Sequence, residues 1–327
     1  MKRTVLRFLK LGLLGLLALL TLLAGLFGYF VYAPEPAPPQ LSGTLRKASI
    51  EVAGLTRSYR VYTPKGLPKG APLVLVMHGS GEGPQRIRMG TGYGFERLAD
   101  AYGFAVAYPK AYASDWNDCS VIGDKKVDGA RADDAGFLAA MVDKLVAEHG
   151  LDPARVFAAG VSNGGSMAMR LALEQPGRYR AVAAVVANVP APQNFQCKPS
   201  AQSTSVMIMN GTLDPLVPYA GGEISLLGLF YKGGPIISSH ASAQYFADWN
   251  HLSAAPQTSR MDVPGGFSVE QNRWRNEGRT EVELVTIHGG GHGLPQAYAQ
   301  RPRLLGPSPM APDGPAMIWD FFARQPR

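Results

Sequence analysis

Residues 72–77 form an apolar run in which hydrophobic and polar positions do not alternate. A strand of this kind must be covered on both faces, as in a mostly parallel sheet with helices on each side. The two runs before it, residues 48–52 and 58–62, are rich in strand-forming residues. They are separated by Gly54, which predicts an antiparallel hairpin.

Strand-like and helix-like segments alternate along the rest of the chain. The strand-like segments are residues 105–108, 156–159, 181–187, 206–209 and 282–287, and the helix-like ones are residues 93–102, 132–149, 164–174, 240–250 and 316–323. This rhythm predicts an α/β fold with a mostly parallel, doubly wound sheet. Asp133 and Asp134 fall in the first turn of one helix, where carboxylates complement the helix dipole, so we expect both to have a capping role.

The N-terminus carries the cations Lys2, Arg3, Arg7 and Lys10, which flank a run without charged residues over positions 11–32. At about 1.5 Å per residue, this run is long enough for a helix to cross a hydrocarbon core of about 30 Å. We therefore predict one transmembrane helix, an uncleaved signal-anchor whose basic end stays in the cytoplasm. A cleaved signal peptide is the alternative, although its apolar region is usually only about 7–15 residues long.

This anchor divides the chain into three parts. Residues 1–33 are the cytoplasmic tip and the anchor, residues 34–45 a proline-rich linker, and residues 46–327 a domain outside the cytoplasm, periplasmic or extracellular. If the N-terminal segment is cleaved, the domain is secreted. The formal net charge is +7, but four cations precede the first acidic residue and leave +3 for the remainder, which argues against nucleic acid as a partner.

The chain contains two cysteines, Cys119 and Cys197. Outside the cytoplasm the redox environment permits a disulfide between them. Two unpaired, half-buried thiols are the other possibility, because the sequence alone does not show that the two sulfur atoms meet.

The pentapeptide Gly160-Val161-Ser162-Asn163-Gly164 matches the G-x-S-x-G pattern of a nucleophile elbow. It lies between a strand candidate and a helix candidate, as that motif requires. The flanking glycines allow a sharp turn that exposes the serine hydroxyl above the sheet. Ser162 is therefore the candidate nucleophile, and an ordinary helix-capping serine is the alternative.

A serine hydroxyl needs a base that takes its proton and a third group that orients the base. Behind such an elbow, an acidic residue and then a histidine follow on loops after later strands. Asp214 follows the strand-like residues 205–211 and is the candidate acid, with an ordinary turn aspartate as the alternative. His292 is the candidate base, in preference to His288 at the strand end, because three preceding glycines let its loop reach the serine. A metal site at these two histidines lacks further ligands nearby, so no metal is predicted.

An oxyanion that develops during acyl transfer needs main-chain N–H donors. One is expected from Asn163, directly after the nucleophile. The other is expected from the glycine-rich loop that starts at His78, in which Ser80 is the candidate donor. His78 itself is expected to support this loop and not to take part in catalysis.

With these residues placed, residues 50–322 resemble the esterase family grouped with polyhydroxybutyrate depolymerases and feruloyl esterases. The matching segments are "LVLVMHGSGEG", "ADDAGFLAAMVDKLVAEHGLDPARVFAAGVSNGGSMAMRLA", "MNGTLDPLVPYAGG", "IHGGGHGLP" and "IWDFF". The resemblance implies an α/β-hydrolase fold and no cofactor. It also places Ser162, Asp214 and His292 on the triad positions of the family.

The sequence departs from the family pattern near the expected cleft. Family members often have Trp-Pro after the loop histidine, whereas this chain has Gly293-Leu294-Pro295, so Leu294 is a cleft candidate. Residues 220–235 fit either a loop over the site or a small insertion that touches the membrane. Within them and just beyond, residues 226–237 are unusually apolar and fit a lipid-facing flap or a buried core strand. Loop aromatics are further cleft candidates: Tyr112, Trp116, Phe195, Tyr219 and Tyr231.

The leading hypothesis is a serine-dependent carboxylic ester hydrolase that works through an acyl-enzyme. Its substrate would be a small or polymer-derived ester of the hydroxyalkanoate, feruloyl or acetyl type. A peptidase or acyltransferase with the same triad is the second hypothesis, because one fold hosts many chemistries. The third is an inactive, membrane-tethered binding module, against which the intact Ser, Asp, His and glycine framework argues.

Overall fold

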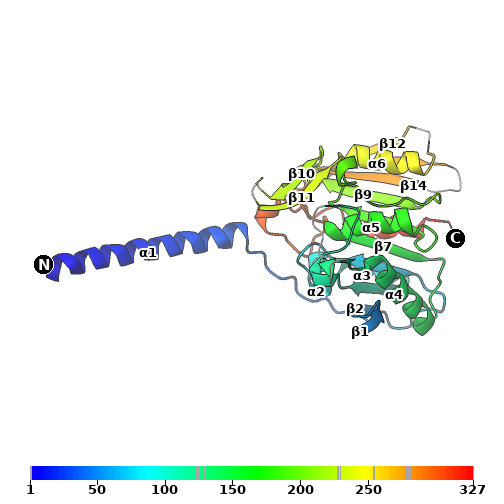
Figure 1. The fold of residues 1–327 in the computed structure, drawn as a ribbon, viewed down its shortest axis with the longest axis horizontal. Helices are drawn as coiled ribbons and strands as arrows, with labels where there is room; N and C mark the ends of the chain where they lie inside the picture. Colours follow the sequence, from blue (N-terminus) through cyan, green and yellow to red (C-terminus); the bar gives the residue numbers. More distant parts are fainter. Residues whose placement is uncertain are drawn as a thin grey trace.

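The computed structural model of the protein describes residues 2–121, 126–127, 130–226, 228, 230–252, 255–276 and 281–326. Its folded domain is built on a sheet of ten strands with helices packed on both faces (Figure 1). Two small hairpins lie outside this sheet: β5 (Lys126–Val127) with β6 (Ala130–Arg131), and β10 (Gly222–Leu226) with β11 (Phe230–Ile236).

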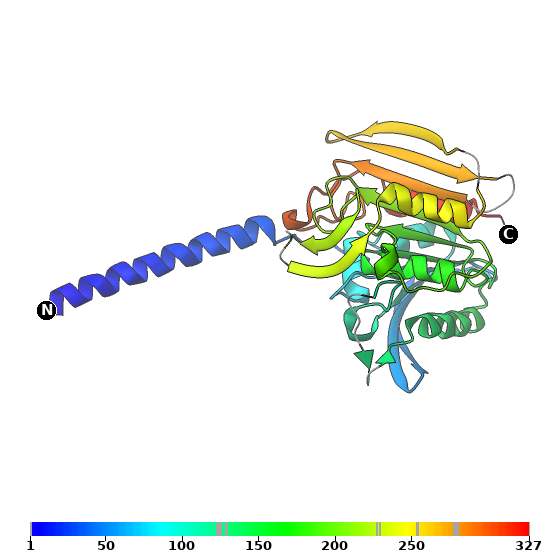
Figure 2. The ribbon, with the colours of Figure 1, turned by 45° about the horizontal axis from the view of Figure 1, so that its top comes forward.

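The central strands of the large sheet run parallel. The strand order is β1-β2-β4-β3-β7-β8-β9-β14-β13-β12, and the pairs from β4–β3 to β9–β14 are parallel. Antiparallel pairs occupy both edges (Figure 2). The bounds are β1 (Thr44–Val52), β2 (Leu55–Thr63), β3 (Leu73–Met77), β4 (Ala105–Pro109), β7 (Val156–Val161), β8 (Ala181–Val185), β9 (Ser205–Gly211), β12 (Gln257–Val263), β13 (Phe267–Arg275) and β14 (Glu281–His288). The predicted doubly wound sheet and the preceding hairpin are confirmed.

Side chains of β3 enter two hydrophobic cores, one on each face of the sheet. Leu73 and Leu75 pack in the core beneath α4, α5 and α6, whereas Val74 and Val76 pack in the core beneath α2, α3 and α7. Every residue of β3, β7, β8 and β9 is buried, which explains why these strands are apolar without alternation. The helices are α2 (Pro84–Gly90), α3 (Gly94–Tyr102), α4 (Asp134–His149), α5 (Asn163–Glu174), α6 (Ser239–Trp249) and α7 (Gly314–Ala323).

The two aspartates at the start of α4 have different roles. Asp133 is the N-cap, and its Oδ1 accepts a hydrogen bond from the Gly136 amide at 2.8 Å. The capping role expected for Asp134 is wrong. Its side chain is fully buried and forms an ion pair with Arg57, and its Oδ2 accepts a hydrogen bond from the Asn117 amide.

Several elements have no counterpart in the prediction. The hairpin β10–β11 occupies residues 222–236, where we expected a loop or insertion, or a core strand. The antiparallel pair β12–β13 extends the sheet beyond β14, and α2 follows the loop after β3. Strand β12 carries no apolar alternation because all but one of its residues are exposed. Such a strand is recognised only by its pairing with β13.

The N-terminal segment forms a long helix, α1 (Lys2–Phe30), which projects away from the domain (Figure 1). Within it, Leu6–Phe30 is long and apolar enough to cross a membrane, with a mean hydropathy of 2.3 and no burial against the domain. The chain then runs to β1, which begins at Thr44, two residues before the expected domain boundary. Ser42 already contacts the domain, because its amide and hydroxyl donate hydrogen bonds to Asp100.

Candidate active site

Ser162 occupies the sharp turn between β7 and α5. Its backbone has φ 56° and ψ −124°, a left-handed conformation that a residue other than glycine rarely adopts. The two motif glycines make this turn possible. A Cβ on Gly160 would lie 2.0 Å from the Gly164 carbonyl oxygen, and a Cβ on Gly164 would lie 2.5 Å from the Met77 carbonyl oxygen. The strand, the strained serine and the helix therefore form the strand-to-helix turn that the sequence motif requires.

Asp214 and His292 meet at the carboxyl ends of two neighbouring strands. Asp214 follows β9 and His292 follows β14, and these strands pair in parallel. Asp214 Oδ2 lies 2.7 Å from His292 Nδ1, and both side chains are almost completely buried. The main-chain amide of His292 also donates to the carbonyl oxygen of Leu305 at 2.6 Å. His288 points elsewhere, with its Nε2 3.6 Å from a carboxylate oxygen of Glu270.

Ser162 and His292 line the same cavity, which has a volume of about 220 Å³. We call it the arginine pocket, because Arg301 forms part of its wall. The other lining residues are Gly79, Ser80, Glu82, Val161, Leu216, Leu226, Tyr231 and Leu305. The two side chains expected to exchange a proton thus line one cavity.

Ser162 also lines a second cavity. We call it the acidic pocket, because Asp115, Asp118 and Asp134 all line it. Ser80 and Tyr231 line both pockets, together with Ser162, and the Ser80 Oγ lies 3.1 Å from the Tyr231 hydroxyl. The candidate nucleophile therefore lines both cavities, and the wall of the arginine pocket is the more apolar of the two.

The two expected oxyanion donors lie beside Ser162. A Cβ on Gly79 would be 3.5 Å from the Ser162 Cβ, so the loop that carries Ser80 passes close to the nucleophile. Asn163 is the first residue of α5, where main-chain N–H groups have no partner within the helix. Among the hydrogen bonds of the described residues, neither the Ser80 amide nor the Asn163 amide donates to a protein acceptor.

His78 supports the oxyanion loop from beneath. It is completely buried, its Nδ1 lies 2.7 Å from the Gly79 carbonyl oxygen, and its Nε2 accepts a hydrogen bond from the Ala111 amide. Burial lowers the pKa of the imidazole and favours the neutral ring that this pair of contacts needs. The Trp116 indole donates to the His78 carbonyl oxygen at 2.9 Å.

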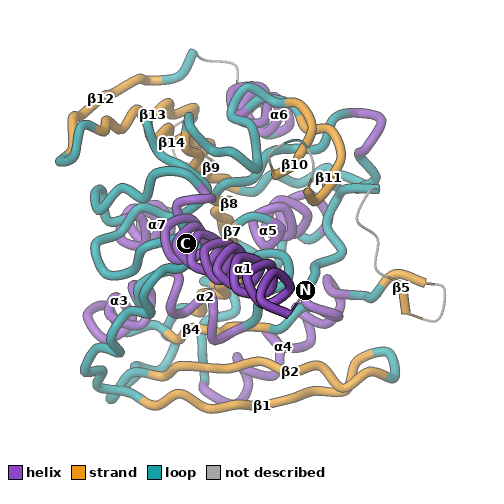
Figure 3. Tube along the Cα trace, turned by 90° about the vertical axis from the view of Figure 1, so that its left-hand side faces the viewer, coloured by secondary structure: helices purple, strands orange, loops and turns teal. Residues whose placement is uncertain are grey.

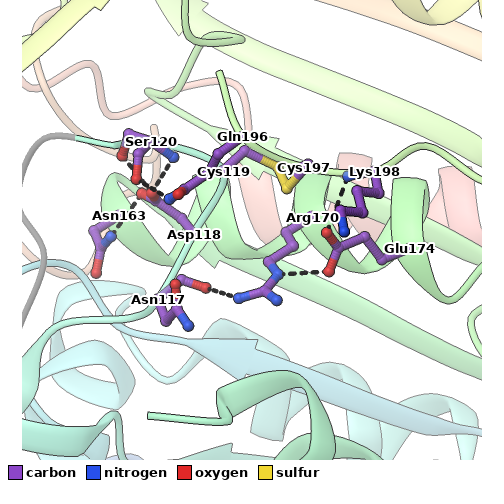
Figure 4. Close-up of a disulfide and its surroundings, with 10 residues drawn as sticks. All are labelled: Asn117, Asp118, Cys119, Ser120, Asn163, Arg170, Glu174, Gln196, Cys197 and Lys198. Carbon is purple, nitrogen blue, oxygen red and sulfur yellow. Dashed lines mark hydrogen bonds and ion pairs between the residues drawn. A yellow bond between two sulfur atoms is a disulfide. The ribbon is translucent and has the colours of Figure 1, made fainter. Parts of the chain in front are cut away.

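The loop over residues 116–120 fixes the side chain of Asn163. The Asn163 Oδ1 accepts from the Trp116 amide at 2.7 Å, and its Nδ2 donates to Asp118 Oδ2 at 2.9 Å. Cys119 in the same loop forms a disulfide with Cys197, and the amide and hydroxyl of Ser120 donate to Asp118 Oδ1 (Figure 4). The disulfide thus ties the loop that holds Asn163 to a segment 78 residues further along the chain.

The cleft candidates separate into two groups. Tyr112 and Trp116 line the acidic pocket, and Tyr231 lines both pockets. Tyr219 points instead to Thr286, with its hydroxyl 2.7 Å from the threonine Oγ1, and Phe195 packs against Tyr245.

Leu294 does not line the cleft as expected. Its side chain is 5% exposed and packs in the hydrophobic core beneath α7. A Cβ on Gly314, the first residue of α7, would lie 2.6 Å from Leu294 Cδ1.

Arg301 is a wall residue that the sequence reasoning missed. Its Nη1 lies 3.6 Å from Glu82 Oε1, and its Nε has no hydrogen-bond acceptor among the described residues. Burial lowers the pKa of the guanidinium, and Glu82 opposes this effect. An arginine remains charged even so, because its usual pKa is far above neutral pH. The residues that the structure describes contain no group of three or more His, Cys, Asp or Glu side chains that could hold a metal ion.

The chain is similar to known esterases. The profile of the family described as "Esterase PHB depolymerase" matches residues 57–219, which include Ser80, Ser162 and Asp214. The chain is 31% identical over 289 residues to "Putative esterase NocK" of Nocardia uniformis subsp. tsuyamanensis, across 84% of this chain and 81% of the relative. It is 28% identical over 251 residues to poly(3-hydroxyalkanoate) depolymerase C of Paucimonas lemoignei, across 72% of this chain and 58% of that relative.

The fold also matches a solved structure. Acetyl xylan esterase from Aspergillus awamori superimposes with a TM-score of 0.56 and 17% identity, over 77% of this chain and 94% of that one. At this identity the likeness concerns the fold alone, which is that of an α/β-hydrolase. The assignment to a family rests on the sequence similarity to the relatives. The chain therefore belongs to the esterase PHB depolymerase family and is a carboxylic ester hydrolase.

Proposed function

We propose that the protein hydrolyses carboxylic esters through a covalent acyl-enzyme on Ser162. The observation that carries this proposal is the shared cavity. A strained serine and a histidine line one pocket, and the histidine is bound through its far nitrogen to Asp214 at 2.7 Å. A serine, a base and a group that orients the base are the parts that nucleophilic acyl transfer needs.

In the first half-reaction, Ser162 Oγ attacks the ester carbonyl carbon and its proton moves to His292 Nε2. The tetrahedral intermediate then collapses, and the departing alcohol takes the proton from His292. In the second half-reaction, water attacks the acyl-enzyme and gives a proton to the same nitrogen. The acid leaves, and Ser162 Oγ recovers the proton.

Asp214 supports this cycle by accepting the hydrogen of His292 Nδ1, which leaves Nε2 free to act as the base. The main-chain amides of Ser80 and Asn163 are proposed to donate hydrogen bonds to the oxyanion. Each such donor is typically worth about 2.7–4 kcal/mol of transition-state stabilisation. The absence of a protein acceptor for both amides among the described residues supports this role.

The residues that line the two pockets indicate which chemical groups of a substrate each pocket would accept. Asparagine and serine side chains, among them Asn117, Ser120 and Asn188, also line the acidic pocket, which suits a group that forms hydrogen bonds. The arginine pocket contains Leu216, Leu226 and Leu305, which suit an apolar group. An ester of the hydroxyalkanoate, feruloyl or acetyl type, which combines polar and apolar parts, is compatible with both.

We further propose that α1 anchors the domain outside the cytoplasm. The cationic residues at its start favour a cytoplasmic N-terminus. The disulfide between Cys119 and Cys197 favours an oxidising compartment for the domain, because disulfides form and persist there. In this arrangement, residues 1–33 are the tip and anchor, residues 34–45 the linker, and the rest the catalytic domain.

The direct test is a series of p-nitrophenyl esters from acetate to laurate, with p-nitroanilide analogues beside them. The full chain in detergent is compared with its Ser162→Ala variant. We expect ester turnover that the substitution abolishes, with anilides cleaved far more slowly. Turnover that survives in Ser162→Ala would rule out the acyl-enzyme on this residue.

A further inference from the structure

The end of α1 contacts a short helix that carries one wall residue of the arginine pocket, Leu305. The guanidinium carbon of Arg303, in the short helix η3 (Arg303–Leu305), lies 4.2 Å from the centre of the Tyr29 ring. Ala33 and the first three linker residues, 34–36, line a surface pocket together with Arg301. The last turn of α1 thus contacts Arg303, and the residues just after α1 lie beside Arg301.

The same short segment belongs to the catalytic machinery. Arg301 and Leu305 line the arginine pocket with Ser162, and the Leu305 carbonyl oxygen accepts the hydrogen bond from the His292 amide. Only Val31 and Tyr32 separate the end of α1 from the docked linker. A chain this short keeps Ala33, which lines the surface pocket with Arg301, within roughly 10 Å of the helix end.

Apolar side chains that are exposed or half-buried lie in the wall of the arginine pocket or, in the case of Leu213, beside Gly306 near it. Leu213 is 59% exposed and Tyr231 is 52% exposed, and Leu226 and Leu305 are half-buried. Figure 1 shows β10–β11 on the side of the domain toward which α1 projects, and Figure 3 views that side along α1. When α1 crosses a bilayer, this side faces the lipid surface.

We propose that this rim, formed by Leu213, Leu226, Tyr231, Arg303 and Leu305, docks on the bilayer that α1 crosses, and that the enzyme draws ester substrates from that lipid surface. The inference rests on the proposed serine esterase function and on an anchor that stays attached. Apolar and aromatic side chains insert at the level of the headgroups, where an arginine binds lipid phosphates. An apolar ester dissolved in the leaflet would then reach Ser162 without crossing water.

The test uses the full chain reconstituted in vesicles of phosphatidylcholine and phosphatidylglycerol in equal parts. Two substrates are compared: water-soluble p-nitrophenyl acetate, and p-nitrophenyl palmitate dissolved in the vesicles. A flexible Gly-Ser insertion of about ten residues between Tyr32 and Ala33 lets the domain drift from the surface. We expect it to lower the palmitate rate by about fivefold or more, because the local concentration of the domain at the surface falls. The acetate rate should stay unchanged.

A matched pair of substitutions tests the contact itself. Tyr29→Leu keeps the span apolar but removes the ring beneath Arg303, so the ratio of palmitate to acetate rates should fall. Tyr32→Leu changes an exposed tyrosine of the same segment and should leave that ratio unchanged. A ratio that is the same in the parent, the insertion and Tyr29→Leu would overturn the docking surface, as would recovery of a chain from which α1 has been cleaved. If the parent itself does not hydrolyse p-nitrophenyl acetate, the proposed function is overturned instead.

Discussion

The carboxylate of Asp214 binds His292 with one oxygen and the main chain with the other. Its Oδ2 lies 2.7 Å from His292 Nδ1, and its Oδ1 accepts hydrogen bonds from the amides of Leu216 and Val217 at 2.8 Å each. Two donors on one oxygen mean that an asparagine here would have to keep its carbonyl oxygen toward the backbone. Its NH₂ group would then face the imidazole.

Asp214→Asn should therefore trap the wrong tautomer of His292. The asparagine NH₂ donates to Nδ1, which moves the hydrogen to Nε2 and leaves no base for Ser162. We expect kcat on p-nitrophenyl acetate to fall by about 10⁴-fold, with the fold unchanged. Steady-state kinetics and far-UV circular dichroism measure the two effects. Asp262→Asn, on the exposed strand β12, is the control and should retain parental activity. A kcat within tenfold of the parent would remove Asp214 from the mechanism.

The candidate site residues that sequence reasoning identified share one property: the residues next to them in the chain indicate their role. Ser162 stands between glycines that the tight turn requires, and His292 follows the glycine run after β14. Asp214 follows β9 in the expected chain order. These residues depend on local backbone geometry and on parallel strands that end at one edge, and both leave a pattern in the sequence.

Residues whose position depends on distant packing were not found. Arg301 meets Glu82 in the arginine pocket from a loop far along the chain that has no motif of its own. Leu294 was expected at the cleft, but the turn after His292 directs it into the core against Gly314. The side-chain direction of a loop residue depends on what packs around it, which spacing alone does not reveal.

Asp118→Ala should weaken the oxyanion hole without touching the nucleophile. Asp118 holds the Asn163 side chain at 2.9 Å, and the Asn163 amide is a proposed oxyanion donor. A donor that is free to shift loses alignment with the transition state more than with the bound ester, so kcat should fall by roughly tenfold with little change in KM. The measurement is kcat and KM on p-nitrophenyl acetate.

A double-mutant cycle separates this effect from direct substrate contact in the acidic pocket. Asn163→Ala keeps the main-chain amide but removes the side chain that Asp118 holds. In that background, Asp118→Ala should have almost no further effect on kcat. Ser120→Ala, which leaves the bond between Asp118 and Asn163 in place, is the matched control and should stay close to the parent. Additive losses in the cycle would contradict the positioning role.

Replacing both cysteines by alanine should lower the free energy of unfolding. At low temperature, where the double variant is still folded, its ester turnover should stay near that of the parent. The disulfide between Cys119 and Cys197 closes a loop with a sequence separation of 78, for which loop entropy gives a limit of about 4.5 kcal/mol. Native disulfides usually contribute about 2–4 kcal/mol, so we expect a loss in that range in urea unfolding. The parent unfolded in the presence of a reductant should match the double variant. Equal midpoints for the oxidised parent and the double variant would show that the bond adds no stability.

His78 should make the stability of the domain sensitive to acid. Burial lowers the pKa of its imidazole in the folded state, whereas the unfolded chain has the ordinary value of about 6.5. The unfolded state therefore binds more protons below that pH. The contribution of His78 is fully present above about pH 6.5 and is lost as the pH falls, by up to about 1.4 kcal/mol per unit. Protonation at Nε2 would also break its bond with the Ala111 amide.

His78→Gln should remove this part of the pH dependence, because glutamine keeps a polar side chain but does not titrate. Urea unfolding between about pH 8 and pH 5 measures it: the free energy of unfolding of the parent should fall more steeply with acid than that of the variant. If the parent and His78→Gln differ by a constant amount across the whole range, the buried imidazole is not the group that titrates. The acid sensitivity of the domain's stability would then have to come from another residue.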